Sequence, residues 1–506
     1  MRFVRLIDRL SMYRFVLLAL VVLAVYALGV AAFDSEFAYT APQLLGSLAI
    51  LVVTCAVVTY ACAAIVRVPP GSESWLITAL ILFFIFPGLL DADTGWGLVL
   101  AGAVASASKY VIAIRRRHIV NPAVASAVIC YLFAYFEIGP FQYGLWWIAA
   151  EPLLIPMIVI GAAVVWKLRE WWLVGTFLVF SVATAIYVAL DIDTPVGDAL
   201  ELAIKSTPLL FVAAIMLTEP LTSPSTRTLS VIYAALVGIL MYWGETFEVT
   251  DDYTLVFTPE IALLAGNLFA FITARRWRRT TLTVDAVHAI GTDTYEVLAS
   301  PAVKFRPGQW ALVSAPTWSP AVEKQGTRRV LSMAGTPTET HTRFGFTAVD
   351  EPSPFKKRLI DGGAGSRLYL DEVGGDFKLP RKTSTPTVFI AGGIGITPFR
   401  SMLADLTART DGDLSHVSMI YAANTEDRLV YADILDEARA RGAQVINVVG
   451  GLVSVGEIEA VARPGAQYYL SGPPAMLAAI KPMLIRAEPE LRWQPWRLHT
   501  DRFIGY

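Results

Sequence analysis

Long apolar runs fill the first half of the chain and are nearly absent from the second half. Ten such runs lie before residue 276, and each approaches the length of about 20 residues that a bilayer requires. They cover residues 13–33, 43–66, 74–90, 95–114, 120–136, 144–166, 171–190, 203–221, 228–244 and 256–274. The pattern predicts a polytopic α-helical membrane domain with ten helices over residues 1–276.

Charged residues between these runs predict an orientation. With ten spans and the N-terminus inside, arginines fall in the inner segments, among them residues 115–117 and 275–279, while the outer loops are acidic. Lys205 is the only lysine of the outer loops. Because cytoplasmic loops are enriched in lysine and arginine, we expect a multi-pass protein of the cell (inner) membrane with both termini in the cytoplasm.

The second half follows two other patterns. Residues 277–385 contain short β runs separated by turn residues, which predicts an antiparallel β-barrel. Residues 386–506 alternate strand-like and helix-like segments, which predicts a doubly wound parallel α/β sheet. The chain is therefore predicted to be multidomain, with a membrane domain, a barrel and an α/β domain in that order.

Composition agrees with this division and excludes several functions. Of 506 residues, 55% are hydrophobic and 17% are charged, which is too apolar for a soluble protein of this size. The net charge of -2 gives no reason to expect a nucleic-acid partner. Cys55, Cys62 and Cys130 cannot supply a four-cysteine iron–sulfur site, and no metal site is predicted. His118 is the only histidine of the first half, so a haem held by histidines on facing helices is excluded.

Two polar stretches interrupt the apolar region. One is SKYVIAIRRRHIVNPA from residue 108, and the other is MLTEPLTSPSTR from residue 216. Each places a polar residue directly before a proline, Asn121 before Pro122 and Glu219 before Pro220. One interpretation is a positive-inside loop followed by a proline in the first turn of a helix. The other is an internal repeat whose broken helices form a binding site.

These stretches resemble the flavin-carrying membrane subunits of the Rnf complex and of the Na+-translocating NADH:quinone reductase. The shared features are a Lys-Tyr segment, an Asn-Pro-Ala segment and a Thr-Asp-Pro-x-Thr-Ser-Pro segment, in which Glu219 replaces the aspartate. The resemblance covers most of residues 40–275 and implies ten helices that bind FMN or riboflavin. The binding residues that it implies are Lys109, Asn121, Pro122, Thr218, Glu219 and Thr222.

The same family often carries FMN on a threonine of a Ser-Gly-Ala-Thr motif. The corresponding neighbourhood here contains Thr207 without the preceding Gly-Ala. Thr207 is therefore either an acceptor of FMN or an ordinary polar residue at the start of a helix.

A glycine-rich turn, IAGGIGITPF, begins at residue 390. A β run ends in Gly392, Gly393 and Gly395, and a helix is expected from Thr397 with Pro398 in its first turn. Glycines let the backbone approach a pyrophosphate closely, and the start of a helix supplies N–H groups with a positive dipole end. The turn therefore predicts a dinucleotide site.

This half of the chain resembles the ferredoxin–NADP reductase family. That resemblance implies an FAD-binding β-barrel over residues 277–385 and an NAD(P)-binding α/β domain over residues 386–506. It implies that Ser332, Ser471 and Tyr506 are catalytic, with Tyr506 covering the flavin. The cofactor-binding residues that it implies are Pro307, Gln309, Arg329, Val330, Leu331, Ser332, Gly392, Gly393, Gly395, Thr397, Pro398 and Gly472. NADH is favoured over NADPH because Gly450 and Gly451 follow the relevant strand, although Arg428 could bind an additional phosphate.

Together these features predict a membrane-bound NAD(P)H dehydrogenase. Electrons would pass from NADH through FAD to a flavin in the membrane domain, and then to a quinone or an extracytoplasmic redox protein. The alternatives are a small-solute transporter gated by a cytosolic reductase domain, and a flavin reductase that is merely anchored in the membrane. The acceptor, any pumped ion and the oligomeric state stay open.

Overall fold

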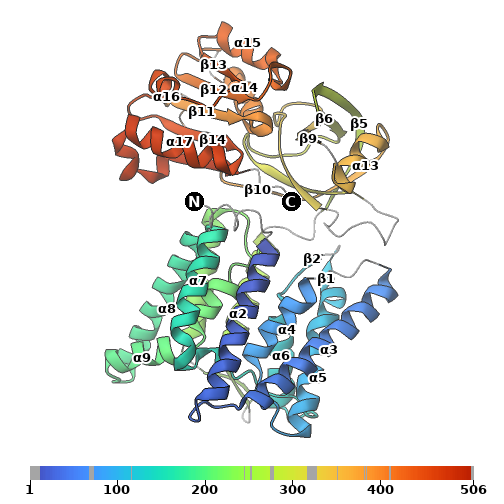
Figure 1. Cartoon of the computed structure of the whole chain (residues 1–506), viewed down its shortest axis with the longest axis vertical. Helices are drawn as coiled ribbons and strands as arrows, with labels where there is room; N and C mark the ends of the chain where they lie inside the picture. Colours follow the sequence, from blue (N-terminus) through green and yellow to red (C-terminus); the bar gives the residue numbers. More distant parts are fainter. Residues whose placement is uncertain are drawn as a thin grey trace. The chain divides into compact units, whose positions relative to one another are not determined.

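The chain divides into two compact units, Met1–Trp277 and Arg278–Tyr506. The computed structural model describes residues 12–67, 73–114, 117–243, 246–250, 253–273, 279–315, 328–349, 352–380, 382, 384–409 and 412–502. The first unit is mainly helical, and the second contains two sheets with surrounding helices (Figure 1). A further boundary at residue 385 stays a prediction.

Helices build the first unit. They are α2 (Met12–Phe33), α3 (Ala41–Val66), α4 (Ser74–Ile85), α5 (Ala92–Val111), α6 (Pro122–Tyr135), α7 (Leu154–Leu168), α8 (Trp171–Asp191), α9 (Val196–Lys205), α10 (Leu209–Phe211), α11 (Arg227–Tyr242) and α12 (Pro259–Thr273). Short elements accompany them: β1 (Ala113–Ile114), β2 (Arg117–His118), the 3-10 turns η1 (Trp147–Ala149) and η2 (Glu151–Leu153), the π-helical turn η3 (Val212–Met216), β3 (Thr246–Thr250) and β4 (Tyr253–Val256).

Every predicted apolar run coincides with helical structure, but the helices differ in length. Among the described residues, four helical stretches are long and apolar enough to cross a membrane, namely α2, α3, η2 with α7, and α8. These four stretches support a membrane association, whereas the predicted count of ten spans stays a prediction.

The pattern predicted one helix over residues 203–221, and this prediction was wrong. The run is part of a broken pair, in which α9 is followed by α10 and η3 after a bend of 58°. Pro208 lies in the break, and a proline disfavours helical backbone at the residue before it.

Helix packing in the first unit repeats between its two halves. In the first half α3 packs against α5 and α5 against α6; in the second half α8 packs against α11 and α11 against α12. The halves meet through equivalent helices, since α2 contacts α7 and α6 contacts α12. This pairing indicates an internal structural repeat that relates residues 12–135 to residues 154–273, and it supports the repeat interpretation of the sequence.

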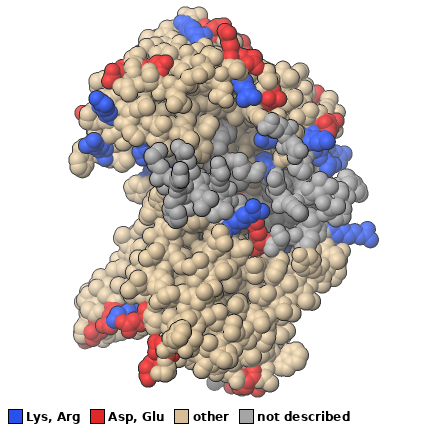
Figure 2. Space-filling model, in the orientation of Figure 1, with Lys and Arg blue, Asp and Glu red and all other residues tan. Residues whose placement is uncertain are grey.

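The outside of the first unit is apolar along its sides. Figure 2 shows acidic side chains gathered at the lower end of this unit, while its flanks are almost free of charge. Among the exposed apolar side chains are Val53 and Val57 of α3, each at least 60% exposed. An apolar surface of this kind is expected where lipid replaces water as the solvent.

A curled antiparallel sheet begins the second unit. Its strands are β5 (Thr280–Gly291), β6 (Thr294–Ser300), β7 (Trp310–Ser314), β8 (Arg328–Ser332), β9 (Thr342–Thr347) and β10 (Arg367–Gly374), in the order β8-β7-β10-β5-β6-β9. One bridge between Met333 and Phe344 joins the two edges of this sheet. Closure into a barrel beyond that bridge stays a prediction. Strand β10 and helix α13 (Pro354–Gly362) were not predicted from the sequence.

A parallel sheet follows, as the alternating pattern predicted. Its elements are β11 (Thr387–Gly392), η4 (Gly393–Ile396), α14 (Thr397–Arg409), β12 (Val417–Ala423), η5 (Glu426–Arg428), α15 (Ala432–Ala440), β13 (Gln444–Val449), α16 (Val455–Val461), β14 (Gln467–Gly472), α17 (Pro474–Ala487), η6 (Pro489–Arg492), η7 (Pro495–Arg497) and β15 (Leu498–Arg502). All strands are parallel, in the order β13-β12-β11-β14-β15. The order reverses between β11 and β14, where ligands of doubly wound sheets usually bind.

Two glycines test the packing of the first unit. A Cβ added to Gly238 of α11 would lie 2.9 Å from the backbone oxygen of Phe177, whereas Gly175 of α8 has nothing within 4 Å. We expect Gly238→Ala to destabilise the unit by roughly 1–3 kcal/mol, because a backbone atom must move. Gly175→Ala should be neutral or stabilising by about 0.5–1 kcal/mol, because alanine favours the helix. Melting temperatures in detergent test both variants, and equal shifts would contradict the helix packing described.

Candidate nucleotide and flavin sites

The ends of β11 and β14 approach each other through glycines. A Cβ on Gly395 would lie 2.3 Å from the carbonyl oxygen of Ser471, and one on Gly472 would lie 3.2 Å from the Cα of Gly392. Gly472 also has a φ of +152°, which few side chains tolerate. The two loops at the switch point can therefore lie in contact only because these positions lack side chains.

This switch point fits a dinucleotide. Gly393 has a φ of +52°, and nothing lies within 4 Å of its Cβ position, so its backbone faces open space. Helix α14 begins at Thr397, as predicted, and offers N–H groups there. The Ser471 side chain is fully buried, and its Oγ has no hydrogen-bond partner among the residues that the structure describes. An open glycine cradle beside an unpaired hydroxyl is suited to a nicotinamide dinucleotide.

Strand β8 carries a second set of predicted residues. Arg329 is buried, and its guanidinium lies 5.7 Å from the ring centre of Phe355 on α13. Burial, and then the neighbouring Arg329 charge, lower the pKa of the Lys356 amine below its usual value. Two cations in a partly buried position match the pyrophosphate of FAD. Lys356 was missed in the sequence because it comes from α13, a helix that the pattern did not predict.

The other predicted residues of β8, from Val330 to Ser332, differ in how deeply their side chains are buried. Val330 is 40% exposed, while Leu331 belongs to the hydrophobic core of the curled sheet. Ser332 is buried and donates a long hydrogen bond of 3.4 Å from Oγ to Oδ2 of Asp501. In the parallel sheet Asp501 of β15 is the register partner of Ser471.

Asp501 therefore links the two predicted catalytic serines. Asp501 was not predicted, because β15 was not recognised as a strand in the sequence. Tyr506, the third predicted catalytic residue, lies outside the described residues.

The predicted Pro-Gly-Gln turn packs against the end of β10. Gly308 has a φ of +90°, and a Cβ there would lie 2.0 Å from the backbone oxygen of Phe377. The Gln309 amide donates to the carbonyl of Gly375 over 3.3 Å. Pro307 opens this turn. The turn thereby joins β7 to the segment that leads into the parallel sheet.

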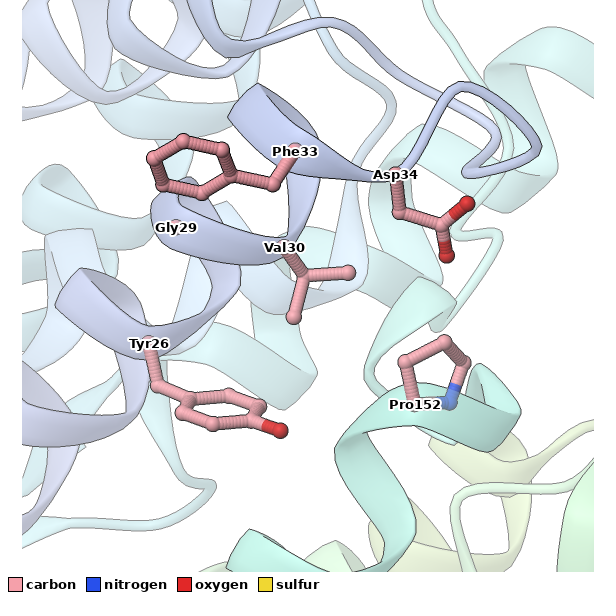
Figure 3. Close-up of a pocket in the computed structure, with 6 residues that line it drawn as sticks. All are labelled: Tyr26, Gly29, Val30, Phe33, Asp34 and Pro152. Atoms are coloured by element: carbon pink, nitrogen blue, oxygen red, sulfur yellow. The ribbon is translucent and has the colours of Figure 1, made fainter.

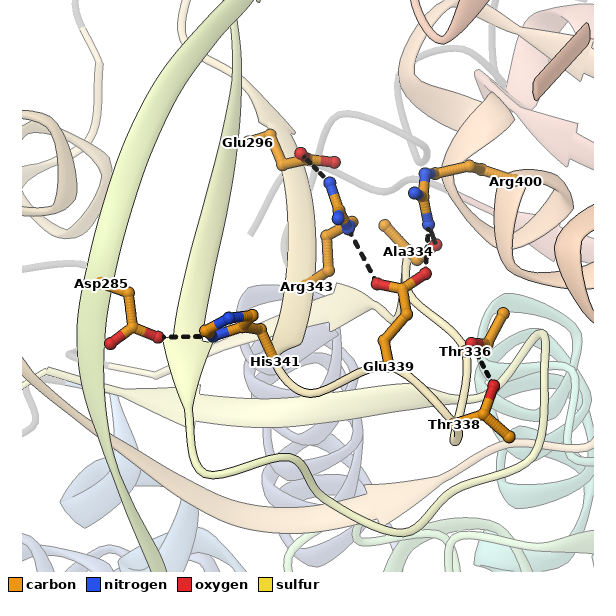
Figure 4. A network of polar contacts seen from close by, with 9 residues as sticks. All are labelled: Asp285, Glu296, Ala334, Thr336, Thr338, Glu339, His341, Arg343 and Arg400. Carbon is orange, nitrogen blue, oxygen red and sulfur yellow. Dashed lines mark hydrogen bonds and ion pairs between the residues drawn. The ribbon is translucent and has the colours of Figure 1, made fainter. Parts of the chain in front are cut away.

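A chain of charges joins the curled sheet to α14. Arg343 pairs with Glu296 and, over 3.1 Å, with Glu339, and Glu339 accepts from Arg400 of α14 over 3.0 Å. Arg400 also donates to the carbonyl oxygen of Ala334, just beyond β8, over 2.7 Å. Figure 4 shows these side chains converging from β6, β9 and α14. The network fixes the start of the pyrophosphate helix relative to the strand that carries Ser332.

A second ion pair links the same two sheets elsewhere. Arg428 of η5 contacts Asp293, in the turn between β5 and β6, over 3.1 Å. This is the arginine that the sequence raised as a possible ligand for a phosphate of NADPH. The two glycines that follow β13 are Gly450, with a φ of +70°, and Gly451.

In the first unit, the two proline-linked polar stretches meet. The Asn121 amide donates to Oε2 of Glu219 over 2.7 Å, although the residues are 98 positions apart, and Thr222 donates to the same oxygen over 3.0 Å. Asn121 also caps α6 by accepting from the backbone N–H of Ala123, and Pro122 is the first residue of that helix. The loop before it is partly a hairpin, since β1 pairs with β2.

Residues from α11 and α12 complete this polar cluster. The backbone N–H of Asn121 donates to Oδ1 of Asn267 over 2.8 Å, and the Asn267 amide contacts the Tyr233 hydroxyl over 3.4 Å. Both Asn267 and Tyr233 are fully buried. They were missed because each lies singly within an apolar run and carries no local motif.

The other predicted residues of the first unit lie around or away from this cluster. Lys109 donates to the backbone and side-chain oxygens of Ser74 and interacts electrostatically with Glu219. Thr218 donates to the carbonyl oxygen of Ala214 within the π-helical region. Thr207 contacts Tyr242 and the carbonyl oxygen of Ala203. It precedes α10 and η3 and is not part of the cluster.

A comparable contact occurs at the start of α12. Glu260 is 2% exposed and accepts from the indole nitrogen of Trp146 over 2.9 Å. The backbone N–H of Trp146 donates to the carbonyl of Ile85, where α4 ends. The start of α12 and the end of α4 are thus linked through one residue, just as the start of α6 is linked to the segment after η3, and both contacts join the two halves.

A surface hollow of the first unit does not form a comparable site. It measures about 440 Å³ and is lined by Tyr26, Gly29, Val30, Phe33, Asp34 and Pro152 (Figure 3). Phe33 is 95% exposed. Asp34 and Tyr26 contribute one carboxylate and one phenol to a groove whose other lining residues are apolar. These two side chains are too few to form a set of hydrogen-bond donors for a nucleotide.

Comparisons with known proteins indicate an oxidoreductase class for the C-terminal region. The family described as "Oxidoreductase NAD-binding domain" matches residues 389–481. Ferredoxin–NADP reductase B of Sorangium cellulosum is 32% identical over 30% of this chain and 59% of its own length. The electron transfer component of 2-halobenzoate 1,2-dioxygenase from Burkholderia cepacia is 28% identical over 38% of this chain and 58% of its own.

A solved structure is also similar. It is the FAD/NAD-binding domain of a nitric oxide dioxygenase from Vibrio cholerae, 19% identical over 44% of this chain and 98% of that one, with a TM-score of 0.38. The chain spans about half to three-fifths of the length of the first curated relatives. Its C-terminal region resembles the ferredoxin–NADP reductase family, and the curated relatives support an NAD(P)H-dependent flavoprotein oxidoreductase.

Gly395 tests the dinucleotide site. Gly395→Ala would press a methyl group against the carbonyl of Ser471, so the loop must shift. We expect the KM for NADH to rise at least about tenfold, or ~1.4 kcal/mol of binding energy. In Gly456→Ala the nearest atom lies 3.8 Å away, so KM should stay near that of the unchanged protein. A Gly395→Ala protein with ordinary NADH kinetics would exclude this loop as the site.

Variants of the charge network test whether it positions α14 relative to the curled sheet. Glu339→Gln weakens the link between α14 and the curled sheet, and Asp293→Asn removes the remote pair with Arg428. We expect Glu339→Gln to lower the rate of flavin reduction by NADH roughly tenfold, because small misplacements slow transfer steeply. Asp293→Asn should leave that rate unchanged. Stopped-flow absorbance measures the rate of flavin reduction. Equal rates in the two variants would show that the network stabilises the fold without positioning α14 for catalysis.

Proposed function

We propose that the chain is a membrane-bound NAD(P)H dehydrogenase that oxidises NADH with FAD in its second unit. The observation that carries this proposal is the contact of the β11 and β14 loops through Gly395 and Ser471. It places an open glycine cradle, a helix start and an unpaired buried hydroxyl at the switch point of the parallel sheet. The relatives that share this region include electron-transfer reductases.

Each residue of the second unit has a role in this proposal. The loop of residues 392–397 holds the pyrophosphate of NADH, and Arg329 with Lys356 holds that of FAD. Ser332 donates to Asp501, the register partner of Ser471, and in this proposal the two serines orient the flavin ring and the nicotinamide by hydrogen bonds. A bound flavin supplies the chemistry that converts a two-electron hydride into single electrons.

We infer that NADH is preferred to NADPH. Gly450 and Gly451 offer no cation to a 2′-phosphate, and Arg428 is engaged with Asp293. The comparison of KM for the two nucleotides measures this preference directly.

In the first unit, the proposed acceptor is FMN or riboflavin held beside Asn121, Pro122 and Glu219. Support comes from the buried polar cluster at the junction of the repeated halves, where Thr222 and Lys109 also lie. Intramembrane ionisable groups are usually functional because burying them is costly. From there, electrons would pass to a quinone or to an extracytoplasmic redox protein.

Two alternatives differ in what the first unit does. A small-solute transporter gated by the reductase unit is favoured by one observation, the broken pair α9 and α10–η3 with its 58° bend. A flavin reductase that is merely anchored in the membrane would need no polar cluster between helices.

The flavin content of the purified full chain separates these functions. We expect about two flavins per chain, one FAD and one FMN or riboflavin, and NADH-driven quinone reduction in liposomes. Asn121→Ser keeps a residue that caps α6 but removes the amide that binds Glu219, so the second flavin should be lost while FAD remains.

Asp91→Ser is the matched control, because Asp91 caps α5 and belongs to no polar cluster described above. Both flavins should remain in that variant. One FAD and no second flavin in the unchanged protein would refute the two-flavin relay. Unchanged flavin content and electron transfer in Asn121→Ser would show that this stretch is only a loop.

A further inference from the structure

Two tryptophans are unusually exposed on the second unit. Trp493 is 82% exposed and Trp496 is 61% exposed, in the segment between α17 and β15. Tryptophan is highly buried on average in folded proteins. Two neighbouring exposed indoles therefore mark a surface that contacts something else.

A buried ion cluster holds this segment rigid. Arg497 is 3% exposed and donates to the carbonyl oxygen of Ala466 over 2.9 Å and to Gln494 over 3.1 Å. It also pairs with Glu488 over 3.4 Å and with Glu490 over 3.3 Å. The Arg497 guanidinium thus joins side chains that precede Trp493 to the residue before β14, and these contacts restrict the segment that carries the two tryptophans.

The segment around this cluster carries a net positive charge. The three arginines Arg486, Arg492 and Arg497 outnumber the two carboxylates Glu488 and Glu490 by one, and Arg497 pairs with both carboxylates. Arg486 at the end of α17 and Arg492 in η6 are exposed, and the residues that the structure describes supply no ion pair to either. We call Arg486, Arg492, Trp493 and Trp496 the Trp493 surface.

We propose that the Trp493 surface docks onto anionic lipid headgroups of the bilayer that holds the first unit. Tryptophan favours the membrane–water interface, where its ring is half apolar and its N–H is hydrated. Exposed arginines are attracted to anionic lipids. The apolar helices of the first unit keep the bilayer within reach, so even weak contacts suffice through a high effective concentration. This docking does not depend on the proposed NADH chemistry.

Hydroxyl-radical footprinting of the full chain in nanodiscs tests this proposal. Peptide mass spectrometry resolves oxidation of Trp493 and Trp496 from that of the other tryptophans. We expect both to be protected in discs containing phosphatidylglycerol and less so in discs of phosphatidylcholine alone. Leu452, which is 89% exposed and distant in sequence, is the internal control and should oxidise equally in both.

A double variant tests the charges. Arg486→Gln with Arg492→Gln should weaken docking by about thirty-fold, since each arginine near an anionic surface contributes about 1 kcal/mol. Protection of the tryptophans in the phosphatidylglycerol discs should then be lost. Arg409→Gln with Arg439→Gln removes the same charge from α14 and α15 and should keep the protection. NADH oxidation should be unchanged in both double variants, because none of the four arginines belongs to the nucleotide site.

Four results would overturn the proposal. Full oxidation of both tryptophans in the phosphatidylglycerol discs excludes membrane docking. Equal protection in the two kinds of disc excludes recognition of anionic headgroups. Protection in detergent that grows with protein concentration assigns the surface to a second copy of the chain. If protection appears only after an acidic redox protein is added, the surface binds that protein instead.

Discussion

The second unit depends on a close approach of two backbones at the switch point of its parallel sheet. Strands β11 and β14 are hydrogen-bonded neighbours, and beyond their ends the chain must turn away in opposite directions. Side chains at Gly395 or Gly472 would separate the two loops. The glycines bring the start of α14 and Ser471 to one place, and the proposed nucleotide site depends on that contact.

The first unit is governed by a different constraint, the need to satisfy polar groups within an apolar environment. A broken helix exposes backbone and side-chain polar atoms that lipid cannot bind. Asn121 satisfies three such groups: its side chain caps α6, its amide donates to Glu219, and its backbone N–H donates to Oδ1 of Asn267. The internal repeat brings such helix ends together from opposite halves. A place where helices break and polar groups converge is also where a polar ligand could enter with little additional cost.

Local sequence patterns predicted the features that depend on neighbouring residues in the chain. They did not predict the features that depend on packing between distant segments. The glycine turn, the helix start at Thr397 and the Asn-Pro and Glu-Pro stretches are short motifs whose backbone consequences are local. By contrast, strand β15 and helix α13 were not recognised in the sequence, so Asp501 and Lys356 had no predicted neighbours. Asn267 and Glu260 lie in apolar runs, and only packing shows that they face polar groups. Hydrophobicity located most of the described helices of the first unit, but most of α9 precedes the predicted run over residues 203–221, and the pattern could not show that this run breaks at Pro208.

Two clusters of charged side chains in the second unit lie next to segments for which we propose a contact. Removing ions from water is costly, so buried ion clusters are poor sources of stability. Yet Glu339 and Arg400 fix the start of the pyrophosphate helix, and Arg497 fixes the segment that displays Trp493. In each case the ions restrict a loop next to a proposed contact, one with NADH and the other with lipid. An apolar core would have held these segments less specifically, because apolar side chains repack whereas a guanidinium with several fixed acceptors has one arrangement.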